Sequence, residues 1–203
     1  MLRARLLFYE RKLNRLGFKL IAGVDEAGRG PLAGPVVAGA AILKDVRFKE
    51  YINDSKKLSK KLREKAYKEI MRKAIVGVGI VDEKTIDKIN IHKATKKAME
   101  KAIAGLKIPP DYVLVDGNMR IVSKCPLKCI VGGDSKSLSI AAASIIAKVT
   151  RDNLMLKYDE IYPHYGFARH KGYPTKSHKT ALKNHGPSPI HRYSFRPVKE
   201  SAH

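Results

Sequence analysis

The apolar positions of this chain form short continuous runs and longer runs with helical spacing. Five continuous runs predict buried strands, at 19–25 (KLIAGVD), 35–43 (PVVAGAAIL), 75–81 (IVGVGIV), 112–116 (YVLVD) and 129–131. The hairpin-like spacing of the first three favours antiparallel pairing. The last two are separated by helical segments and can pair in parallel.

Helical spacing of apolar residues appears in four places. A basic segment at 2–16 predicts one helix, and a second begins after Ser59, whose hydroxyl can accept a free N–H. A third starts at Ile91, and Gly105 stands where a left-handed cap would end it. The run 140–149 (IAAASIIAKV) is apolar almost all round and predicts a buried helix.

This order of elements predicts an α/β fold with a five-stranded mixed sheet and helices on both faces. No strand pattern appears from about residue 162 onward, where prolines interrupt the chain. We therefore expect a main domain at 1–161 and a small helical cap at 162–203.

Charge adds a functional indication. Lys and Arg number 41 against 19 Asp and Glu, a formal net charge of +22. This balance favours binding to nucleic acid, although a merely soluble lysine-rich surface is the alternative and charge does not separate an enzyme from a passive binder. No apolar run is long enough to span a bilayer, and we find no signal-peptide pattern, so we expect a cytoplasmic protein.

The acidic residues stand out because they are scarce and follow the strands directly. Asp25 and Glu26 end the first strand, Asp116 ends the fourth, and Asp134 follows the fifth. If strands one and four are parallel neighbours, Asp25 and Asp116 emerge side by side, at the edge where open α/β sheets place their sites. Like charges about 4 Å apart cost roughly 1–4 kcal/mol, and a hard divalent cation such as Mg²⁺ removes that cost. For any one acid alone, a solvated turn residue is the better interpretation.

Two loops offer donors to a nucleic-acid backbone. Gly28, Arg29 and Gly30 follow the first strand, and their N–H groups can face a sugar or a phosphate. Ser55 and Lys56 belong to the sequence NDSKK, whose hydroxyl and ammonium groups suit a phosphate contact. A tight turn and an exposed charged loop are the respective structural alternatives.

The segment after residue 162 combines basic and aromatic residues. Basic side chains can hold phosphates while a ring stacks on a sugar or a base. We expect the histidines to be solvated beside a phosphate track; a zinc site is less favoured because no ligand-pair spacing stands out. The residues concerned are His164, Arg169, His170, Lys171, Tyr173, Lys176, His178, Lys179, His185, His191 and Arg192.

Taken together, these segments resemble the ribonuclease HII family from about residue 19 to residue 196. Two matches are long and highly specific: 23–37 (GVDEAGRGPLAGPVV), and 133–134 (GD) followed by 140–152 (IAAASIIAKVTRD). Shorter matches support them at 54–58 (DSKKL), 115–117 (VDG), 165–167 (YGF), 171–173 (KGY) and 190–192 (IHR).

The resemblance implies a ribonuclease H-like fold and an endoribonuclease that cuts the RNA strand of RNA–DNA hybrids and cuts 5′ of single ribonucleotides in duplex DNA. The backbone of 28–30 would sense the ribose 2′-hydroxyl, and Tyr173 would stack on the adjoining deoxyribose. The expected cofactor is a pair of Mg²⁺ or Mn²⁺ ions, and the products carry 3′-hydroxyl and 5′-phosphate ends. The catalytic residues and metal ligands implied are Asp25, Glu26, Asp116 and Asp134.

Three other identities are weighed against this one. Ribonuclease HIII shares many of these motifs but carries an added N-terminal domain, for which we expect no room before residue 19. A non-catalytic duplex-binding protein could keep the fold, but the four retained acids argue against it. Another nuclease or a resolvase on the same fold would differ in its substrate. We also expect a monomer, and a structural role for Asp152 on the helix after Lys148.

Overall fold

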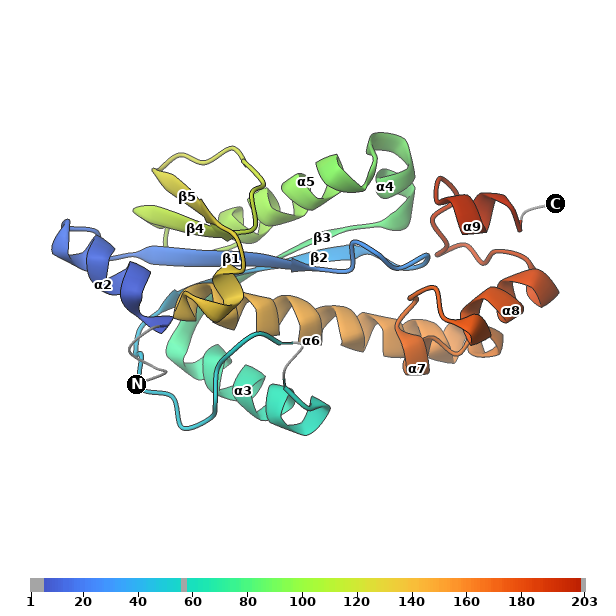
Figure 1. The fold of residues 1–203 in the computed structure, drawn as a ribbon, viewed down its shortest axis with the longest axis horizontal. Helices are drawn as coiled ribbons and strands as arrows, with labels where there is room; N and C mark the ends of the chain where they lie inside the picture. Colours follow the sequence, from blue (N-terminus) through green and yellow to red (C-terminus); the bar gives the residue numbers. More distant parts are fainter. Residues whose placement is uncertain (1–5, 56–57, 202–203) are drawn as a thin grey trace.

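The computed structural model describes residues 6–55 and 58–201, and a five-stranded sheet lies at its centre (Figure 1). The strand order is β3-β2-β1-β4-β5. β2 pairs antiparallel with both β1 and β3, whereas β4 runs parallel to β1 and β5 parallel to β4. The expected mixed sheet is therefore confirmed. The strands are β1 (Ile21–Ala27), β2 (Val36–Leu43), β3 (Ala74–Val81), β4 (Tyr112–Asp116) and β5 (Leu127–Ile130).

Helices cover both faces of the sheet, as expected. In Figure 1, α5 lies on one side, α3 and α6 lie on the other, and α7, α8 and α9 gather around the C-terminal end of α6. In the described part of the chain, no helix combines the length and the apolar character of a membrane span. The helices are α2 (Phe8–Arg15), α3 (Lys60–Lys73), α4 (Glu83–Ile89), α5 (Ile91–Ala104), α6 (Leu138–Ile161), α7 (Phe167–His170), α8 (Lys176–His185) and α9 (Arg196–Lys199), with 3₁₀ turns at Gly133–Ser135 and Pro163–Tyr165.

Two helices differ from the sequence expectations. α6 continues to Ile161, far beyond its apolar run. The apolar pattern misses this second half because it buries only one face, through Arg151 and Met155. The apolar pattern does not reveal α4, which is short and begins at a capping residue, Asp82, whose carboxylate accepts the N–H of Thr85 at 2.7 Å. One-sided and very short helices carry too few apolar positions to be recognised by spacing.

Element ends also shift slightly. β1 continues to Ala27, two residues past the expected end, and β5 begins earlier than expected, at Leu127. The left-handed cap expected at Gly105 is wrong, since its φ is −78° and its N–H simply continues the helical bonding to the Lys101 carbonyl. Of the first predicted helix, the structure describes α2 and the residues just before it, and positions 1–5 lie outside the described residues.

Alternate residues of β1 face opposite layers. Ala22 and Val24 pack with α5, whereas Gly23 faces α6. A Cβ on Gly23 would lie 2.1 Å from the carbonyl carbon of Ser139, so this helix rests directly on the strand backbone. Glycine allows the same close approach of a helix to the sheet at Gly39, Gly77 and Gly79.

The segment after α6 folds onto the loop between β1 and β2. Its apolar side chains share one cluster with Leu32 and Ala33 of that loop. The Leu32 N–H donates to the Gly172 carbonyl at 2.8 Å, and the Gly34 N–H donates to the Ile190 carbonyl at 2.8 Å. The C-terminal segment therefore supports the loop that follows the first acidic strand.

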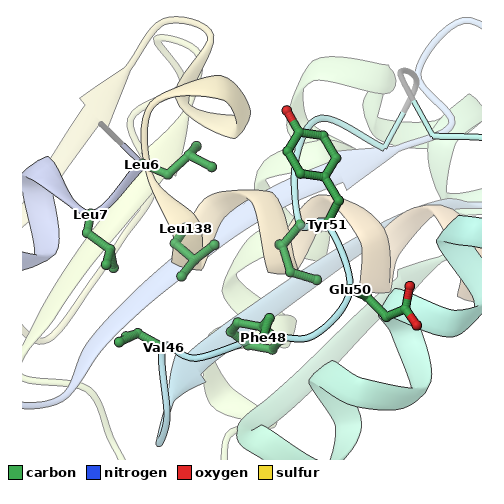
Figure 2. A pocket seen from close by; sticks show the side chains of 8 residues that line it. Leu6, Leu7, Val46, Phe48, Glu50, Tyr51 and Leu138 are labelled. Atoms are coloured by element: carbon green, nitrogen blue, oxygen red, sulfur yellow. The ribbon is translucent and has the colours of Figure 1, made fainter. Parts of the chain in front are cut away.

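An apolar pocket lies between the N-terminal segment and the start of α6 (Figure 2). Leu6, Leu7 and Leu138 line it, together with Val46 and Phe48 from the loop after β2. None of the described residues that line the pocket carries a cationic side chain. A phosphate backbone is held mainly by cations, so this pocket is not the candidate nucleic-acid site.

Candidate active site

The parallel pairing of β1 and β4 brings Asp25 and Asp116 together. The last residue pair in register is Val24 with Val115, so the next residue on each strand is an aspartate. Both aspartates lie on the α6 side of the sheet, because Val24 and Val115 belong to the cluster on the α5 side. The expectation that they emerge side by side is confirmed.

Asp25 is buried, with 5% of its surface exposed. Its Oδ1 accepts the Glu26 N–H at 2.7 Å, and the Ser144 hydroxyl of α6 also hydrogen-bonds its carboxylate. Burial raises the pKa of Asp25 well above its usual range, and the negative charges of Glu26 and Asp116 raise it further. Without a cation, Asp25 is thus an acid whose ionised form is strongly disfavoured.

Glu26 points to the opposite face of β1 but takes part in the same charge cluster. Burial raises its pKa, Arg29 lowers it, and Asp116 raises it again. The Arg29 Nη1 lies 3.4 Å from the Glu26 Oε1, and the Arg29 side chain is about half exposed. Arg29 therefore neutralises part of the negative charge at this strand end.

Asp134 is linked to the cluster through its own turn. The Gly133 N–H donates to Asp116 Oδ1 at 2.6 Å, which fixes the 3₁₀ turn Gly133–Ser135 against the end of β4. A Cβ at Gly133 would lie 2.6 Å from the end of the Ile140 side chain and 3.2 Å from Asp116 Oδ1, so a larger residue would require the Ile140 side chain to move. Asp134 is half-buried in that turn.

These carboxylates suit a hard divalent cation chemically. The atoms that they offer to a metal are all oxygens, which Mg²⁺ and Mn²⁺ prefer. Mg²⁺ commonly binds through one or two carboxylates and several waters. Among the described residues, no three His, Cys, Asp or Glu side chains already form a closed metal-binding set. Asp25, Glu26 and Asp116 each direct one oxygen to a protein donor, and mutual repulsion opposes closer approach until a cation is present.

Replacing Asp25 by Asn should stabilise the metal-free protein at neutral pH. The raised pKa means that the folded protein binds this proton more tightly than the unfolded chain does. Stability therefore falls as pH rises from the usual value near 3.8 up to the folded pKa, by about 1.4 kcal/mol per unit of difference. Thermal unfolding in chelator from pH 4 to pH 8 should show this decline in the wild type and a weaker decline in the variant.

Asp45→Asn is the matched control for that experiment. Asp45 is an exposed-loop acid whose pKa is lowered by the Arg47 N–H, so its loss should not stabilise the protein at neutral pH. An Asp25→Asn variant that is less stable than the wild type at every pH would contradict the assigned cause.

The loop after β1 and Tyr173 also lie together. Gly28 has a φ of +97°, and a Cβ there would lie 2.1 Å from the Arg151 Nε, so both backbone and space require glycine. A Cβ on Gly30 would lie 3.7 Å from the ring of Tyr173, which is 40% exposed. The expected sugar-sensing and stacking residues thus form one continuous surface.

The second expected substrate loop is placed differently. Ser55 is buried, and its Oγ lies 3.0 Å from the Oγ of Ser144, the same residue that bonds Asp25. A direct phosphate contact by Ser55 would require this hydroxyl to leave Ser144. Lys56, the other expected contact in this loop, lies outside the described residues.

Several histidines of the tail are buried, so the expectation of solvated histidines is wrong for His170, His178 and His191. His170 and His178 stack with ring centroids 4.4 Å apart, and the Nε2 atoms of His178 and His191 lie 3.0 Å apart. Burial lowers the pKa of His178 to about 4 and that of His191 to about 3. These rings are neutral at pH 7 and build the cap.

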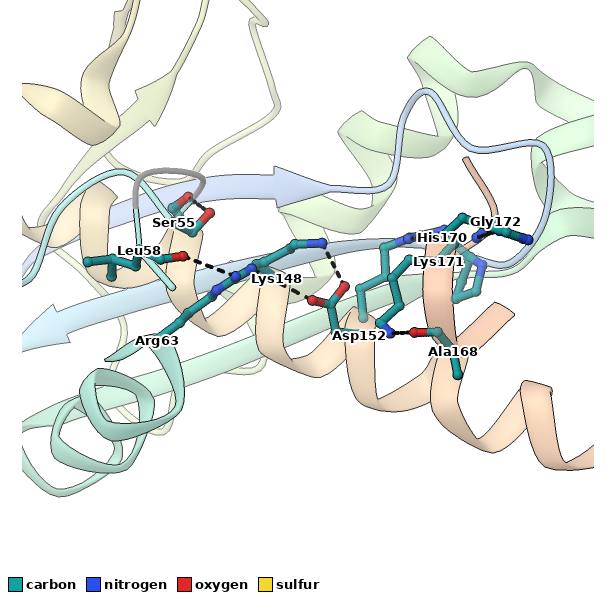
Figure 3. Close-up of polar contacts among 12 residues, drawn as sticks. Ser55, Leu58, Arg63, Lys148, Asp152, Ala168, His170, Lys171 and Gly172 are labelled. Atoms are coloured by element: carbon teal, nitrogen blue, oxygen red, sulfur yellow. Dashed lines mark hydrogen bonds and ion pairs between the residues drawn. The ribbon is translucent and has the colours of Figure 1, made fainter. Parts of the chain in front are cut away.

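A cationic cluster surrounds Asp152 between α3 and α6 (Figure 3). Lys148 Nζ lies 2.7 Å from Asp152 Oδ1, and Arg63 Nη1 lies 3.7 Å from Oδ2. Burial lowers the pKa of the nearby Lys171, Asp152 raises it, and Lys60 and Lys148 lower it again. Asp152 has the expected position on the helix after Lys148. Because Arg63, Lys148 and Lys171 outnumber this one acid, they leave a positive surface beside the Ser55 loop.

A mixed sheet with acids gathered at the ends of β1 and β4 is the arrangement of a ribonuclease H-like fold, and the net charge of +22 suits a nucleic-acid substrate. A family model described as Ribonuclease HII matches residues 22–198. The chain belongs to the ribonuclease HII family. It is therefore a metal-dependent endoribonuclease that acts on RNA–DNA hybrids.

Individual relatives agree with this assignment. The chain is 50% identical to a ribonuclease HII of Syntrophotalea carbinolica, covering 96% of this chain and 93% of the relative. It is 56% identical to one of Bacillus licheniformis, covering 94% and 75% respectively. The crystal structure of ribonuclease H2 from Pyrococcus horikoshii superposes with a TM-score of 0.76 at 28% identity, over 90% of this chain and 96% of that one.

Proposed function

We propose that this enzyme cuts duplex DNA on the 5′ side of a single embedded ribonucleotide, as well as cutting RNA–DNA hybrids. One observation carries the proposal: β1, whose Asp25 lies beside Asp116 of β4, leads directly into the glycine loop 28–30, and the surface of that loop continues into the Tyr173 ring. The metal-binding residues and the sugar-recognition loop would thus lie next to each other. In cells this activity would serve ribonucleotide excision repair and removal of RNA primers.

The acids would hold the reacting phosphate through two Mg²⁺ or Mn²⁺ ions, which supply an activated water and neutralise the leaving 3′-oxygen. Asp25 and Asp116 are fixed on neighbouring strands and would bind a metal ion between them. Glu26 and Asp134 approach from the strand end and from the 3₁₀ turn. The products would carry 3′-hydroxyl and 5′-phosphate ends.

Recognition of the ribonucleotide would use the loop and the ring. The N–H groups of Arg29 and Gly30 would donate to the 2′-hydroxyl, the group that distinguishes RNA from DNA. The Tyr173 ring would stack on the next deoxyribose, which requires that the following nucleotide be DNA. This pair of contacts supports the preference for an RNA-to-DNA junction.

The region 162–203 would act as the substrate-binding cap of a catalytic domain spanning 1–161. Its exposed cations, together with the cluster around Asp152, suit contacts to duplex phosphates. Ser55 would contribute a phosphate contact by turning its hydroxyl away from Ser144. We propose that the enzyme works as a monomer in the cytoplasm.

A set of matched duplexes tests the proposal. They carry one ribonucleotide, the same position as deoxyribonucleotide, or a full RNA strand, each with Mg²⁺, Mn²⁺ or chelator. We expect one cut 5′ to the ribonucleotide, with 3′-hydroxyl and 5′-phosphate ends, and no cut in plain DNA or in chelator. Cleavage of the hybrid without cleavage of the single-ribonucleotide duplex would contradict the proposed specificity.

Tyr173→Ala should reduce turnover at a single ribonucleotide about 5- to 150-fold, since stacking on an aromatic ring contributes roughly 1–3 kcal/mol. Tyr173→Phe is the matched control and should stay near wild type, because it keeps the ring. Steady-state cleavage of the single-ribonucleotide duplex measures both. Equal losses in the two variants would show that the hydroxyl, and not the ring, carries the effect.

A further inference from the structure

Two arginines, Arg151 of α6 and Arg192 of the C-terminal cap, are fully buried. Within the described residues neither forms an ion pair with a carboxylate. Burying an unpaired cation is costly, and burial lowers the pKa of Arg192 to about 9 and that of Arg151 to about 10. Such an arrangement needs a compensating set of hydrogen-bond acceptors.

Backbone carbonyls of the loop after β1 supply these acceptors. Arg192 Nη2 donates to the Gly28 carbonyl at 2.6 Å and to the Gly34 carbonyl at 2.8 Å. Its Nη1 donates to the Arg29 carbonyl at 3.0 Å and to the Pro31 carbonyl at 2.8 Å, and its Nε donates to Gly34 at 2.9 Å. A guanidinium has five N–H donors, so all of them bind this one loop.

Arg151 holds the same loop from the α6 side. Its Nη2 donates to the Ala33 carbonyl at 3.0 Å, and its Nε donates to the Pro35 carbonyl at 3.0 Å. Its Nη1 reaches the Lys171 carbonyl at 2.9 Å, two residues before Tyr173. One side chain therefore connects the glycine loop to the segment that carries the stacking ring.

The direction of the carbonyls fixes the direction of the N–H groups. In a planar trans peptide, the N–H of each residue points opposite to the preceding carbonyl. Because the Gly28 and Arg29 carbonyls point inward to Arg192, the N–H groups of Arg29 and Gly30 point away from it. Both residues are exposed, and neither N–H has a hydrogen-bond partner among residues 6–55 and 58–201.

We propose that Arg192, assisted by Arg151, is a positioning residue for ribonucleotide recognition: it orients the free N–H groups of Arg29 and Gly30 toward the ribose 2′-hydroxyl. Neither arginine touches the substrate in this arrangement. The inference rests on the proposed function, since it assumes that these N–H groups read the sugar.

Arg192→Lys tests the proposal. A lysine keeps the positive charge but presents one nitrogen, which cannot span four carbonyls in the geometry of a guanidinium. The measurement is the affinity for two duplexes that differ in a single 2′-hydroxyl, in Ca²⁺ to prevent cleavage. The wild type should bind the duplex with the 2′-hydroxyl about 2- to 12-fold more tightly than the all-DNA duplex, and this ratio of affinities is the contribution of one net hydrogen bond. The variant should lose this ratio while its affinity for the all-DNA duplex stays unchanged.

Turnover of the variant on the single-ribonucleotide duplex should fall about 10- to 100-fold, as is typical when groups that orient a site are replaced. Arg196→Lys, on an exposed arginine paired with Glu200, is the matched control and should keep both the ratio and the turnover. A merely structural role for Arg192 would lower the melting temperature and leave the affinity ratio intact.

The outcomes separate the two claims. A wild type that binds both duplexes equally would refute recognition of the 2′-hydroxyl and thus the proposed function. A wild type that discriminates, with an Arg192→Lys variant that discriminates equally, would refute the positioning role alone. If Arg192→Lys does not fold, Phe195→Leu removes the ring that lies 5.2 Å from the guanidinium and should lower the ratio partway. An unchanged ratio in Phe195→Leu would likewise overturn the positioning role.

Discussion

Replacing Asp116 by Asn should abolish hydrolysis of both hybrid and single-ribonucleotide substrates, with turnover falling about a thousand-fold or more. Loss of one group that stabilises charge at a reacting centre commonly costs 10²–10³-fold, and here a metal ligand would be lost as well. Asparagine has the same shape, and its amide oxygen can still accept the Gly133 N–H that holds the neighbouring turn. The fold and the basic duplex-binding surface should therefore remain.

Cleavage assays with Mg²⁺ and Mn²⁺, and duplex affinity in Ca²⁺, measure the two effects separately. Asp45→Asn is the control, since this acid lies in an exposed loop and pairs with Arg47 and Lys73. Its turnover should match the wild type. Normal turnover in Asp116→Asn would remove Asp116 from the metal site, whereas loss of duplex binding would show that its main role is structural.

Gly23→Ala should destabilise the protein by about 3 kcal/mol or more, because its Cβ would lie 2.1 Å from the Ser139 backbone. The obstacle is helix backbone, which cannot rotate away as a side chain can. α6 would have to move off β1, and this helix carries Ser144 against Asp25. At about 2–4 °C per kcal/mol, the melting temperature should fall by roughly 6–12 °C or more.

Gly105→Ala is the matched control for this substitution. Gly105 has an ordinary φ of −78°, and its nearest contact for a new Cβ is 3.3 Å. Thermal unfolding of both variants should show a small change for Gly105→Ala and a large one for Gly23→Ala. Equal melting temperatures would mean that α6 can shift away from β1 at little cost.

The strands follow from the local apolar pattern, and the placement of two acids follows once the first and fourth strands are parallel neighbours. Continuous apolar runs identify buried strands, and parallel pairing of the first and fourth runs necessarily places Asp25 beside Asp116. The resemblance to ribonuclease HII then adds roles for Glu26 and Asp134. The β1–β4 register confirms the position of the two aspartates at the edge of the sheet, whereas the catalytic and metal-binding roles of the four acids remain predictions.

The interior of the cap could not be predicted in this way. His178 and His191 have polar side chains, and only the folded arrangement shows that they are buried beside Phe167. The role of Arg192 is equally hidden, because its carbonyl partners are distant in sequence. Burial of a polar side chain depends on long-range contacts, which apolar spacing does not encode.

The separation between Gly28 and Arg192, 164 positions, has a consequence for biosynthesis. At 5–20 residues per second, roughly 8–30 s pass between the synthesis of the two ends of this contact. Once Asp134 has been synthesised, the nascent polypeptide contains all four acids of the proposed reaction centre, yet the loop proposed to read the sugar still lacks its anchor. The proposed selectivity would thus be acquired only after Arg192 has been synthesised and has reached the loop.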